Sequence, residues 1–284
     1  MNIDQPLVSV VVPAYRHEIY VTEALTSVYG QDYEAIELIV VDDRSPDGTA
    51  AAIRDYLGRG EVKTRFVRIV FIENETNLGA HRTINRGIEE SQGAYINILN
   101  SDDAFAPARV STLVRTCKEN GAEFAFSRVE MLVDGNSVLS READYLGSIQ
   151  DGIDLFPTVG YALLRNQCAL TSGNFFFART LHERVGDFSD LKYCHDWDFI
   201  LRSLLITEPV FVPEVLYFYR IHPGNSFLQL QSVAESETEA VLRRYFFSCR
   251  NRPVTNPLAP SPAWGPFFES FVRQAQYHHY LAKP

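Results

Sequence analysis

Short apolar segments alternate with amphipathic segments through the first hundred residues of the chain. Residues 7–12 and 37–41 are β-branched and almost uniformly apolar, a pattern typical of strands buried on both faces of a parallel sheet. Two further strands are predicted at residues 65–72 and 95–99. The amphipathic segments between them predict helices at residues 19–29, 49–56 and 80–90. We therefore expect a Rossmann-like, doubly wound, mostly parallel α/β sheet with right-handed crossovers and helices on both faces.

The alternation loosens after residue 105. Residues 134–162 carry no clear period and are punctuated by glycines, which predicts a substrate-facing loop or lid. Around this stretch the pattern predicts helices at 109–119, 197–205 and 233–247, and strands at 124–133, 175–177 and 211–219. A proline-rich link then leads to a short aromatic helix at 267–281. We divide the chain into one α/β domain at 1–226, with halves at about 1–105 and 106–226, and a helical C-terminal extension at 227–284.

Composition sets limits on the function. The chain has 284 residues, 46% of them hydrophobic and 22% charged, as in ordinary globular proteins. Its net charge of −10 argues against a general nucleic-acid binder. Four scattered cysteines form no metal-ligand spacing, which favours a reducing cytoplasm. The first six residues do not resemble a secretory signal, and no apolar run reaches membrane-spanning length.

The fourth predicted strand runs directly into polar residues. Asn100, Ser101, Asp102 and Asp103 follow the apolar run at 95–99. Ligands of open parallel sheets collect at the carboxyl ends of the strands, and two acids there make an oxygen-rich site suited to Mg²⁺ or Mn²⁺. The alternative is a helix N-cap ahead of a helix opened by Pro107, which would explain one of the four polar residues.

A second acid pair, Asp42 and Asp43, ends the second predicted strand. Adjacent acids repel, so two pairs in one sheet suggest a shared cleft in which one pair holds a metal and the other a polar ligand group. The chain has no glycine-rich dinucleotide motif and no P-loop. The first strand is followed instead by Pro13, Ala14 and Tyr15, an apolar and aromatic corner suited to stacking on a flat base.

Several spaced motifs together resemble family 2 glycosyltransferases. They are the segments at 8–15, 24–33 and 37–49, then Asn-Leu-Gly at 77–79 and Leu-Asn-Ser-Asp-Asp at 99–103. Later segments at 173–177, 185–188, 195–202 and 219–222 are similar to further blocks of that family, in the family's order. The resemblance spans about residues 7–226. It implies a GT-A fold and inverting transfer of a sugar from a nucleotide-diphosphate sugar by direct displacement, with a UDP-sugar favoured.

The resemblance also implies roles for individual residues. Pro13, Ala14 and Tyr15 would line the base pocket, Asp43 would hydrogen-bond the base, and Arg82 would contact the nucleotide. Asp103 would bind Mg²⁺ or Mn²⁺ directly, with Asp102 nearer the ribose. Asp196 would be the general base that takes the acceptor's proton, and the positive end of its helix would favour the ionised carboxylate.

Two residues depart from the family's motifs. Asn100 stands where the metal motif usually begins with aspartate, and His195 stands where glutamate usually precedes the base. These departures bear on metal affinity and acceptor geometry more than on the reaction class. Arg220 and His222 match a family position near the leaving phosphates or the domain edge, and strand-end packing is the simpler interpretation.

Partners follow from the same resemblance. The donor would be a nucleotide-sugar, and the acceptor a sugar, a glycan or a lipid-linked glycan of polysaccharide biosynthesis, with no nucleic acid involved. The C-terminal aromatic residues most simply cover a flank of the domain; the alternative is peripheral contact with a partner or the inner face of the membrane. Two other functions are weighed: a catalytically silent nucleotide-sugar-binding protein and a nucleotidyltransferase, which lacks its expected basic glycine-rich loop here.

Overall fold

One eight-stranded sheet organises the molecule, in the order β3-β2-β1-β4-β7-β6-β8-β5. The computed structural model describes residues 5–133, 137–225 and 230–281. The strands are β1 (Val8–Ala14), β2 (Ile36–Asp42), β3 (Arg68–Glu73), β4 (Tyr95–Ile98), β5 (Ala104–Phe105), β6 (Phe124–Val133), β7 (Phe176–Ala178) and β8 (Val210–Ile221). Pairs β3–β2, β2–β1, β1–β4 and β6–β8 are parallel, and the pairs with β5 and β7 are antiparallel. The predicted mixed, mostly parallel sheet is therefore confirmed.

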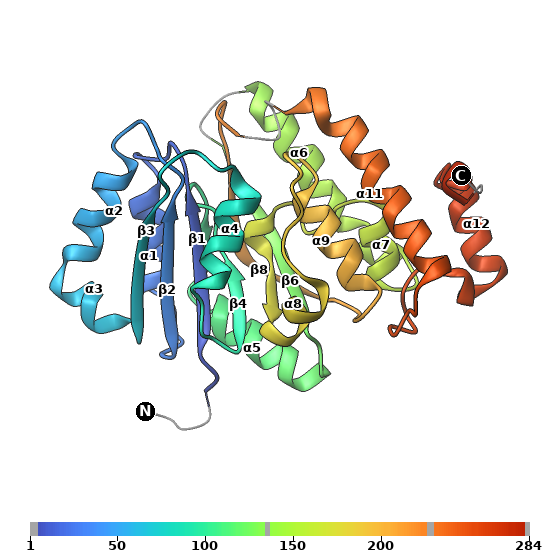
Figure 1. Ribbon diagram of the computed structural model, residues 1–284, viewed down its shortest axis with the longest axis horizontal. Coiled ribbons are helices and arrows are strands. Elements are labelled where there is room, and N and C mark those ends of the chain that lie inside the picture. The colour runs from blue at the N-terminus through green and yellow to red at the C-terminus, as the bar shows by residue number, and fades with distance from the viewer. Residues whose placement is uncertain (1–4, 134–136, 226–229, 282–284) are drawn as a thin grey trace.

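Helices cover both faces of this sheet (Figure 1). In the first half they are α1 (Val21–Tyr29), α2 (Thr49–Gly58), α3 (Gly60–Arg65) and α4 (Ala80–Glu89). Those that follow are α5 (Arg109–Asn120), α6 (Ser137–Asp151), α7 (Val159–Arg165), α8 (Arg179–Val185), α9 (His195–Leu204), α11 (Gln231–Asn251) and α12 (Pro266–Gln274). Short 3₁₀ turns are η1 (Ile153–Leu155), η2 (Ser172–Asn174), η3 (Pro262–Trp264) and η4 (His278–Leu281).

The pleat of the central strands divides the core into two layers. In β1, Val8, Val10 and Val12 pack with α1, α2 and α5, whereas Val11 faces α4 and the later helices. Successive side chains of a strand point to opposite faces, so a uniformly apolar strand fills both layers. This is why the β-branched runs of the sequence form the interior of the sheet.

The stretch after β6 corrects one sequence-based expectation. Residues 134–162 were expected to form a loop or lid, but α6, η1 and the start of α7 occupy most of it; residues 134–136 lie outside the described part. The helices form because tertiary packing overrides a weak pattern: Tyr161, Leu163 and Leu164 are fully buried in the main core cluster. The one or two short strands expected at 211–219 form a single twelve-residue strand, β8.

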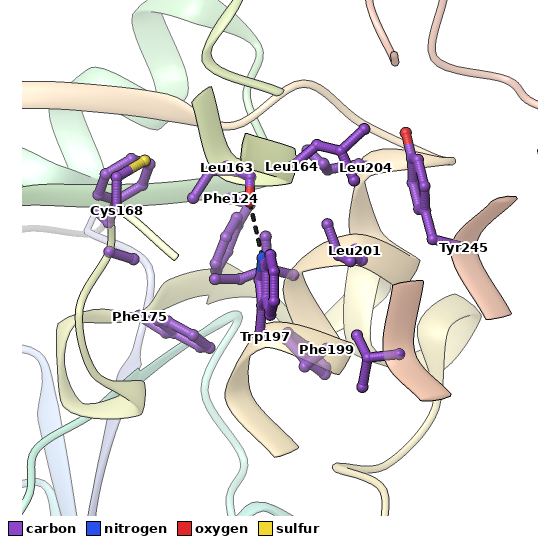
Figure 2. Close-up of a cluster of buried hydrophobic side chains, with 14 of the residues drawn as sticks. Phe124, Leu163, Leu164, Cys168, Phe175, Trp197, Phe199, Leu201, Leu204 and Tyr245 are labelled. Atoms are coloured by element: carbon purple, nitrogen blue, oxygen red, sulfur yellow. Dashed lines mark hydrogen bonds between the residues drawn. The ribbon is translucent and has the colours of Figure 1, made fainter. Parts of the chain in front are cut away.

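The C-terminal extension is part of the same core. Tyr245 and Phe246 of α11 and Phe268, Phe271 and Val272 of α12 are buried in the cluster that also contains α7 and α9. Figure 2 shows Tyr245 on the α11 side of this cluster, across from Leu201 and Leu204 of α9. Trp197 of α9 donates its indole N–H to the Leu163 carbonyl at 2.7 Å, the dashed line in Figure 2. Figure 1 shows α11 crossing beside α9 and α7.

The aromatic residues of the extension largely pack inward. Tyr161 of α7 makes edge contacts with Trp264, Phe267 and Phe271, with ring centroids 4.9 to 5.3 Å apart. Phe271 is buried and Trp264 half-buried, whereas Phe267 is exposed. These contacts support the flank-covering interpretation. Within the described ranges, we find no helix long and apolar enough to span a membrane.

Candidate active site

The carboxyl ends of β1, β2, β3 and β4 meet at one edge of the sheet. Backbone hydrogen bonds continue past the strands there: Asp43 N to Ala14 O (2.8 Å), Asn74 N to Asp42 O (2.8 Å) and Leu99 N to Val11 O (2.9 Å). These bonds hold the residues after each strand side by side. The two predicted acid pairs therefore lie on one edge, as the sequence suggested.

Three side chains at this edge form a group able to hold a metal ion. The Nε2 atoms of His17 and His222 lie 3.6 Å and 3.1 Å from Asp102 Oδ2, and the ligand atoms all lie within 4.8 Å of one another. Ser101 Oγ lies 2.8 Å from His17 Nδ1. A proton on that Nδ1 leaves the Nε2 lone pair directed at Asp102, the usual arrangement for a metal-binding histidine. Two imidazole nitrogens and one carboxylate suit a divalent transition metal.

Asp103 lies outside this group. Tyr217 OH donates to its Oδ2 at 2.6 Å, Asn100 Nδ2 to the same oxygen at 3.2 Å, and the Arg220 backbone N–H to its Oδ1 at 2.8 Å. Both oxygens are thus committed to the protein, and the residue is 1% exposed. The geometry does not support the prediction that Asp103, rather than Asp102, binds the metal directly.

The two acids also differ in charge. Burial and the neighbouring Asp102 charge raise the pKa of Asp103 well above its usual value. Burial also acts to raise the pKa of Asp102, but the hydrogen bond from His222 and the charge of His17 outweigh it and lower that pKa overall. The pair therefore ionises first at Asp102, the member with metal-ligating neighbours.

The departure at Asn100 has a structural reason. Its side-chain amide donates to Asp103 Oδ2 and, at 2.6 Å, to Thr171 Oγ1. An aspartate at position 100 cannot donate either bond while ionised, and it would add a third negative charge beside Asp102 and Asp103.

Asp43 is held by the loop before α4. Its carboxylate accepts hydrogen bonds from Leu78 N (2.7 Å), Gly79 N (2.8 Å) and Asn74 Nδ2 (2.7 Å). Gly79 has φ of 87°, a backbone conformation that favours glycine. Asp43 therefore shapes the loop that borders the expected base pocket.

The expected base pocket lies at the end of β1. Ala14 is buried, Pro13 is half-buried and Tyr15 is 38% exposed, so the tyrosine ring is accessible for stacking. Arg82 is at the start of α4, exposed, and its Nη2 pairs with Asp190 at 2.6 Å. That ion pair directs Arg82 toward the loop before α9.

Asp196 lies in the first turn of α9. Its Oδ2 accepts from Gln167 Nε2 at 2.7 Å and its Oδ1 from Trp197 N at 2.6 Å. Gln167 Oε1 accepts from Leu170 N at 2.6 Å, which fixes the amide with its NH₂ toward the carboxyl. Burial raises the pKa of Asp196 more than His195 and Gln167 lower it. The helix start was expected to favour ionisation, and desolvation outweighs it.

The charges of three predicted site acids act on one phenol, that of Tyr219. Burial raises the pKa of Tyr219 well above its usual value, and the charges of Asp103, Asp102 and Asp196 raise it further. All three carboxyls therefore lie within electrostatic reach of Tyr219 on β8. The structure thus brings the predicted metal-site acids and the predicted base toward the same region.

Sequence reasoning missed His17 and Gln167 and gave His222 only a weak role. His17 and His222 are separated from Asp102 by 85 and 120 positions, since they follow β1 and β8 whereas Asp102 follows β4. No local spacing signals such a set. Arg220, near the end of β8, donates through Nε to the Asp102 carbonyl at 2.9 Å and through Nη2 to Glu23 at 2.7 Å.

An open α/β sheet with acids and a group able to hold a metal ion at its carboxyl edge is the arrangement expected of a GT-A glycosyltransferase. The family model for glycosyl transferase family 2 matches residues 9–184, more than half of the chain, so this chain belongs to that family. The matched segment contains Asp43, Asp102 and Asp103 and ends before Asp196 and His222.

Two curated relatives are similar to the chain. An uncharacterized glycosyltransferase of Rickettsia prowazekii (strain Madrid E) is 29% identical over 230 residues, covering 79% of this chain and 67% of that protein. The putative teichuronic acid biosynthesis glycosyltransferase TuaG of Bacillus subtilis (strain 168) is 31% identical over 137 residues, covering 48% of this chain and 52% of that protein.

Solved structures with different donors share the fold. S. aureus TarS 1–349 in complex with UDP-GlcNAc aligns with a TM-score of 0.69 at 17% identity, covering 96% of this chain and 72% of that chain. The mannosyltransferase PcManGT from Pyrobaculum calidifontis in complex with GDP-Man and Mn²⁺ aligns with a TM-score of 0.62 at 18% identity, covering 99% and 76%. This chain covers 43% of a longer S. aureus TarS chain.

Proposed function

We propose that this glycosyltransferase inverts the sugar it transfers, moving it from a nucleotide-diphosphate sugar, with a UDP-sugar favoured, to an acceptor hydroxyl. The observation that carries the proposal is that two chemically different acids both act on the pKa of Tyr219. Asp102 is the ionised member of a metal-ligating group, whereas Asp196 stands apart from that group with a raised pKa. Direct displacement needs these two features, one for the leaving diphosphate and one for the incoming hydroxyl.

The residues at the sheet edge fit a divalent cation. Asp102, His17 and His222 would hold it, and two imidazoles favour Mn²⁺ over Mg²⁺. When bound, the cation supplies Lewis-acid stabilisation of charge on the diphosphate. Gly224 N donates to His222 Nδ1 at 3.2 Å, which leaves the imidazole proton on Nε2, facing Asp102. Ligation through Nε2 would therefore require the neutral ring to carry its proton on Nδ1 instead.

The nucleotide contacts proposed from the family resemblance lie along the same edge. Tyr15 would stack on the base beside Pro13 and Ala14, and Asp43 would accept a base N–H with its remaining acceptor capacity. Because the Asp43 carboxylate also fixes Leu78 and Gly79, it would set both the shape and the hydrogen bonding of the base pocket. Arg82 would reach the nucleotide only after leaving Asp190.

Asp196 would perform the proton transfer. Its carboxylate takes the proton of the acceptor hydroxyl while that oxygen bonds to the anomeric carbon and the bond from that carbon to the diphosphate breaks. Attack from the face opposite the leaving group inverts the anomeric configuration. A raised pKa makes Asp196 a stronger base than an ordinary aspartate, and Gln167 holds the oxygen that is not bonded to Trp197.

For the acceptor we propose a sugar, a glycan or a lipid-linked glycan of polysaccharide biosynthesis. The support is the printed role of TuaG, a relative placed in teichuronic acid biosynthesis. A cytoplasmic site of action is supported by Cys117, Cys168, Cys194 and Cys249, which are buried and form no disulfide.

Calorimetry with UDP in the presence of Mn²⁺, Mg²⁺ or EDTA tests the metal-dependent donor site. The parental protein should bind UDP only with a divalent cation. In Asp102→Asn, the metal-dependent binding of UDP should be lost. Asp103→Asn is the matched comparison, because it changes the neighbouring carboxyl that lies outside the ligand group.

Each alternative has its own outcome. Equal UDP affinity with Mn²⁺ and with EDTA would remove the metal site from the proposal. Loss of metal dependence in Asp103→Asn but not in Asp102→Asn would restore the assignment made from the sequence. Binding of UDP-, dTDP- and GDP-sugars without hydrolysis or transfer would identify a catalytically silent binding protein.

A further inference from the structure

The backbone just before Asp196 is held by a carboxylate from the C-terminal extension. The N–H groups of Lys192, Tyr193 and Cys194 all donate to Glu237 of α11, at 2.9, 2.8 and 2.9 Å. Three successive backbone donors converging on one carboxylate make strong charge-assisted hydrogen bonds. Cys194 is the N-cap residue of α9 and makes no side-chain cap bond, so the start of that helix is fixed from α11.

A second contact ties the same two helices further along. Arg244 of α11 donates through Nη1 to Asp198 Oδ1 at 2.7 Å and to Ser189 Oγ at 3.0 Å. Asp198 is 1% exposed and also accepts from Arg202 at 2.8 Å. Residues 237 and 244 are seven positions apart, two turns of one helix face. One face of α11 therefore contacts both the loop at 189–194 and the first turn of α9.

Apolar packing on the same face makes the contact rigid. Val241 and Tyr245 of α11 lie one turn and two turns beyond Glu237 and are 1% and 2% exposed. They belong to the core cluster that contains Leu201 and Leu204 of α9, and Figure 2 shows Tyr245 beside these two leucines. A displacement of α11 would therefore carry the backbone before Asp196 with it.

We propose that Glu237 is a positioning residue that sets the place of the Asp196 carboxyl through the backbone of residues 192–194. The inference rests on the proposed function, in which Asp196 accepts the proton of the acceptor. Asp196 has two anchors of its own, Gln167 and the Trp197 N–H, and Glu237 fixes the loop from which it projects. Reacting groups must be placed within a fraction of an ångström, and a displacement of about 1 Å costs on the order of 10²-fold in rate.

The charge at Glu237 is consistent with this role. Burial acts to raise the pKa of Glu237, but the backbone donors of Cys194, Lys192 and Tyr193, together with His195, lower it overall. The carboxylate is thus ionised wherever Asp196 is. Its three backbone bonds remain in place across the pH range in which a general base of raised pKa operates.

The experiment compares Glu237→Ala and Glu237→Gln with Glu235→Ala. Glu235 lies on the same helix and is exposed, so its variant controls for removing an acid from α11. Four readouts are taken on the full chain: hydrogen exchange of amides 192–194, UDP affinity with Mn²⁺, kcat and acceptor KM for transfer, and the pH profile of kcat/KM. A thermal melt of each variant reports the folded fraction.

In Glu237→Ala, amides 192–194 should lose protection and transfer should fall about 10- to 100-fold, with UDP affinity unchanged. The acidic limb of the pH profile should move to lower pH, because a displaced Asp196 gains water and loses part of its raised pKa. The transfer rate of Glu237→Gln should lie between those of the parental protein and Glu237→Ala, since an amide accepts through one oxygen only. A variant that was merely unstable would lose active protein without moving the pH profile.

Two results would overturn the inference while leaving the transferase intact. One is faster exchange at amides 192–194 with parental kinetics and pH profile; the other is an equal loss of transfer in Glu235→Ala. If Glu237→Ala does not fold, Glu237→Gln carries the same comparison. An inactive parental protein, or parental transfer by Asp196→Asn, would overturn the proposed function and this inference with it.

Discussion

The proposed nucleotide and acceptor halves of the site are built in different ways. In the nucleotide half, Asp43 is held by backbone N–H groups of the loop after the neighbouring strand, and the ends of β1 to β4 are joined by backbone hydrogen bonds. In the acceptor half, Asp196 is in the first turn of α9. The start of that helix is held by Gln167, from the loop after α7, and by Glu237 of α11. The first half is positioned by the sheet, the second by packing between distant helices.

This difference predicts which changes each half tolerates. A side-chain substitution near Asp43 leaves the backbone bonds of the sheet in place, so its effect stays local. A substitution near Asp196 removes one of few side-chain anchors, and the helix start shifts as a unit. The Asp102 group combines both modes, because β4 places Asp102 while β8 brings His222 from 120 positions away.

The largest expected effect separates proton transfer from donor binding. Asp196→Asn keeps the size of the side chain and removes its basicity, so transfer should fall about 10²–10⁴-fold while UDP affinity with Mn²⁺ stays parental. Single-turnover rates and calorimetry measure the two quantities. Asp187→Asn, in the exposed loop before α9, is the control and should transfer normally. If UDP binding fell with transfer, the two halves would not be separable as described.

The next effect belongs to the nucleotide half. Asp43→Ala removes a carboxylate that accepts three hydrogen bonds, and loss of one charge-assisted bond to the base costs about 1.5–3 kcal/mol, or roughly 10- to 150-fold in UDP affinity. The requirement for a metal should persist. Glu75→Ala, exposed on the same edge, should bind UDP as the parent does. Unchanged affinity in Asp43→Ala would place the base elsewhere along the sheet edge.

The third effect in size is the pH dependence of the transfer rate, which should come from Asp196 in the acceptor half. Asp196 must be deprotonated to act, so transfer should rise about tenfold per pH unit below its raised pKa and level off above it. The ionisable groups around it are His195, Tyr193, Cys194 and Tyr219. Because folding raises this pKa, the stability contributed by the carboxyl is present at low pH and is lost as pH rises through the folded-state pKa.

Two measurements test the direction of the Asp196 pKa shift. The kcat/KM profile of the parental protein should show its acidic limb above the ordinary aspartate pKa of about 3.9, and Asp196→Asn should lack that limb. A limb that persists in Asp196→Asn would assign it to another group, with His195 and Asp198 next to test.

The smallest effect concerns the contact between α9 and α11. Arg244→Ala removes a charge-assisted hydrogen bond to buried Asp198. The ion pair between Asp198 and Arg202 remains. Since Arg244 is 45% exposed, we expect a loss of about 1–2 kcal/mol in the free energy of unfolding. Arg243→Ala breaks the exposed pair with Glu239 and the contact of Arg243 with the Tyr280 ring, and should cost less than about 1 kcal/mol. Denaturant unfolding of the two variants makes the comparison; equal losses would mean that α11 is not anchored through Asp198.

Several features followed from the sequence alone. The β-branched runs at β1 and β2 gave buried parallel strands, because apolar side chains on both faces of a strand fit only between two helical layers. The acid pairs that end β2 and β4 were predicted to share an edge, and they do, because parallel neighbours place their carboxyl ends together. Helix and strand identity in residues 1–105 depended on local periodicity and was largely predictable.

The tertiary structure decided what depends on contacts between distant segments. It packed residues 137–151 and 159–162 into helices where the sequence pattern predicted a loop, and it brought His17 and His222 to Asp102. It also gave the carboxyls of the adjacent Asp102 and Asp103 different partners, since Tyr217 OH and the Arg220 backbone N–H donate only to that of Asp103. Local sequence fixes which face of a strand a side chain takes, whereas hydrogen-bond partners and desolvation, which set ligand choice and pKa, come from segments a hundred residues away.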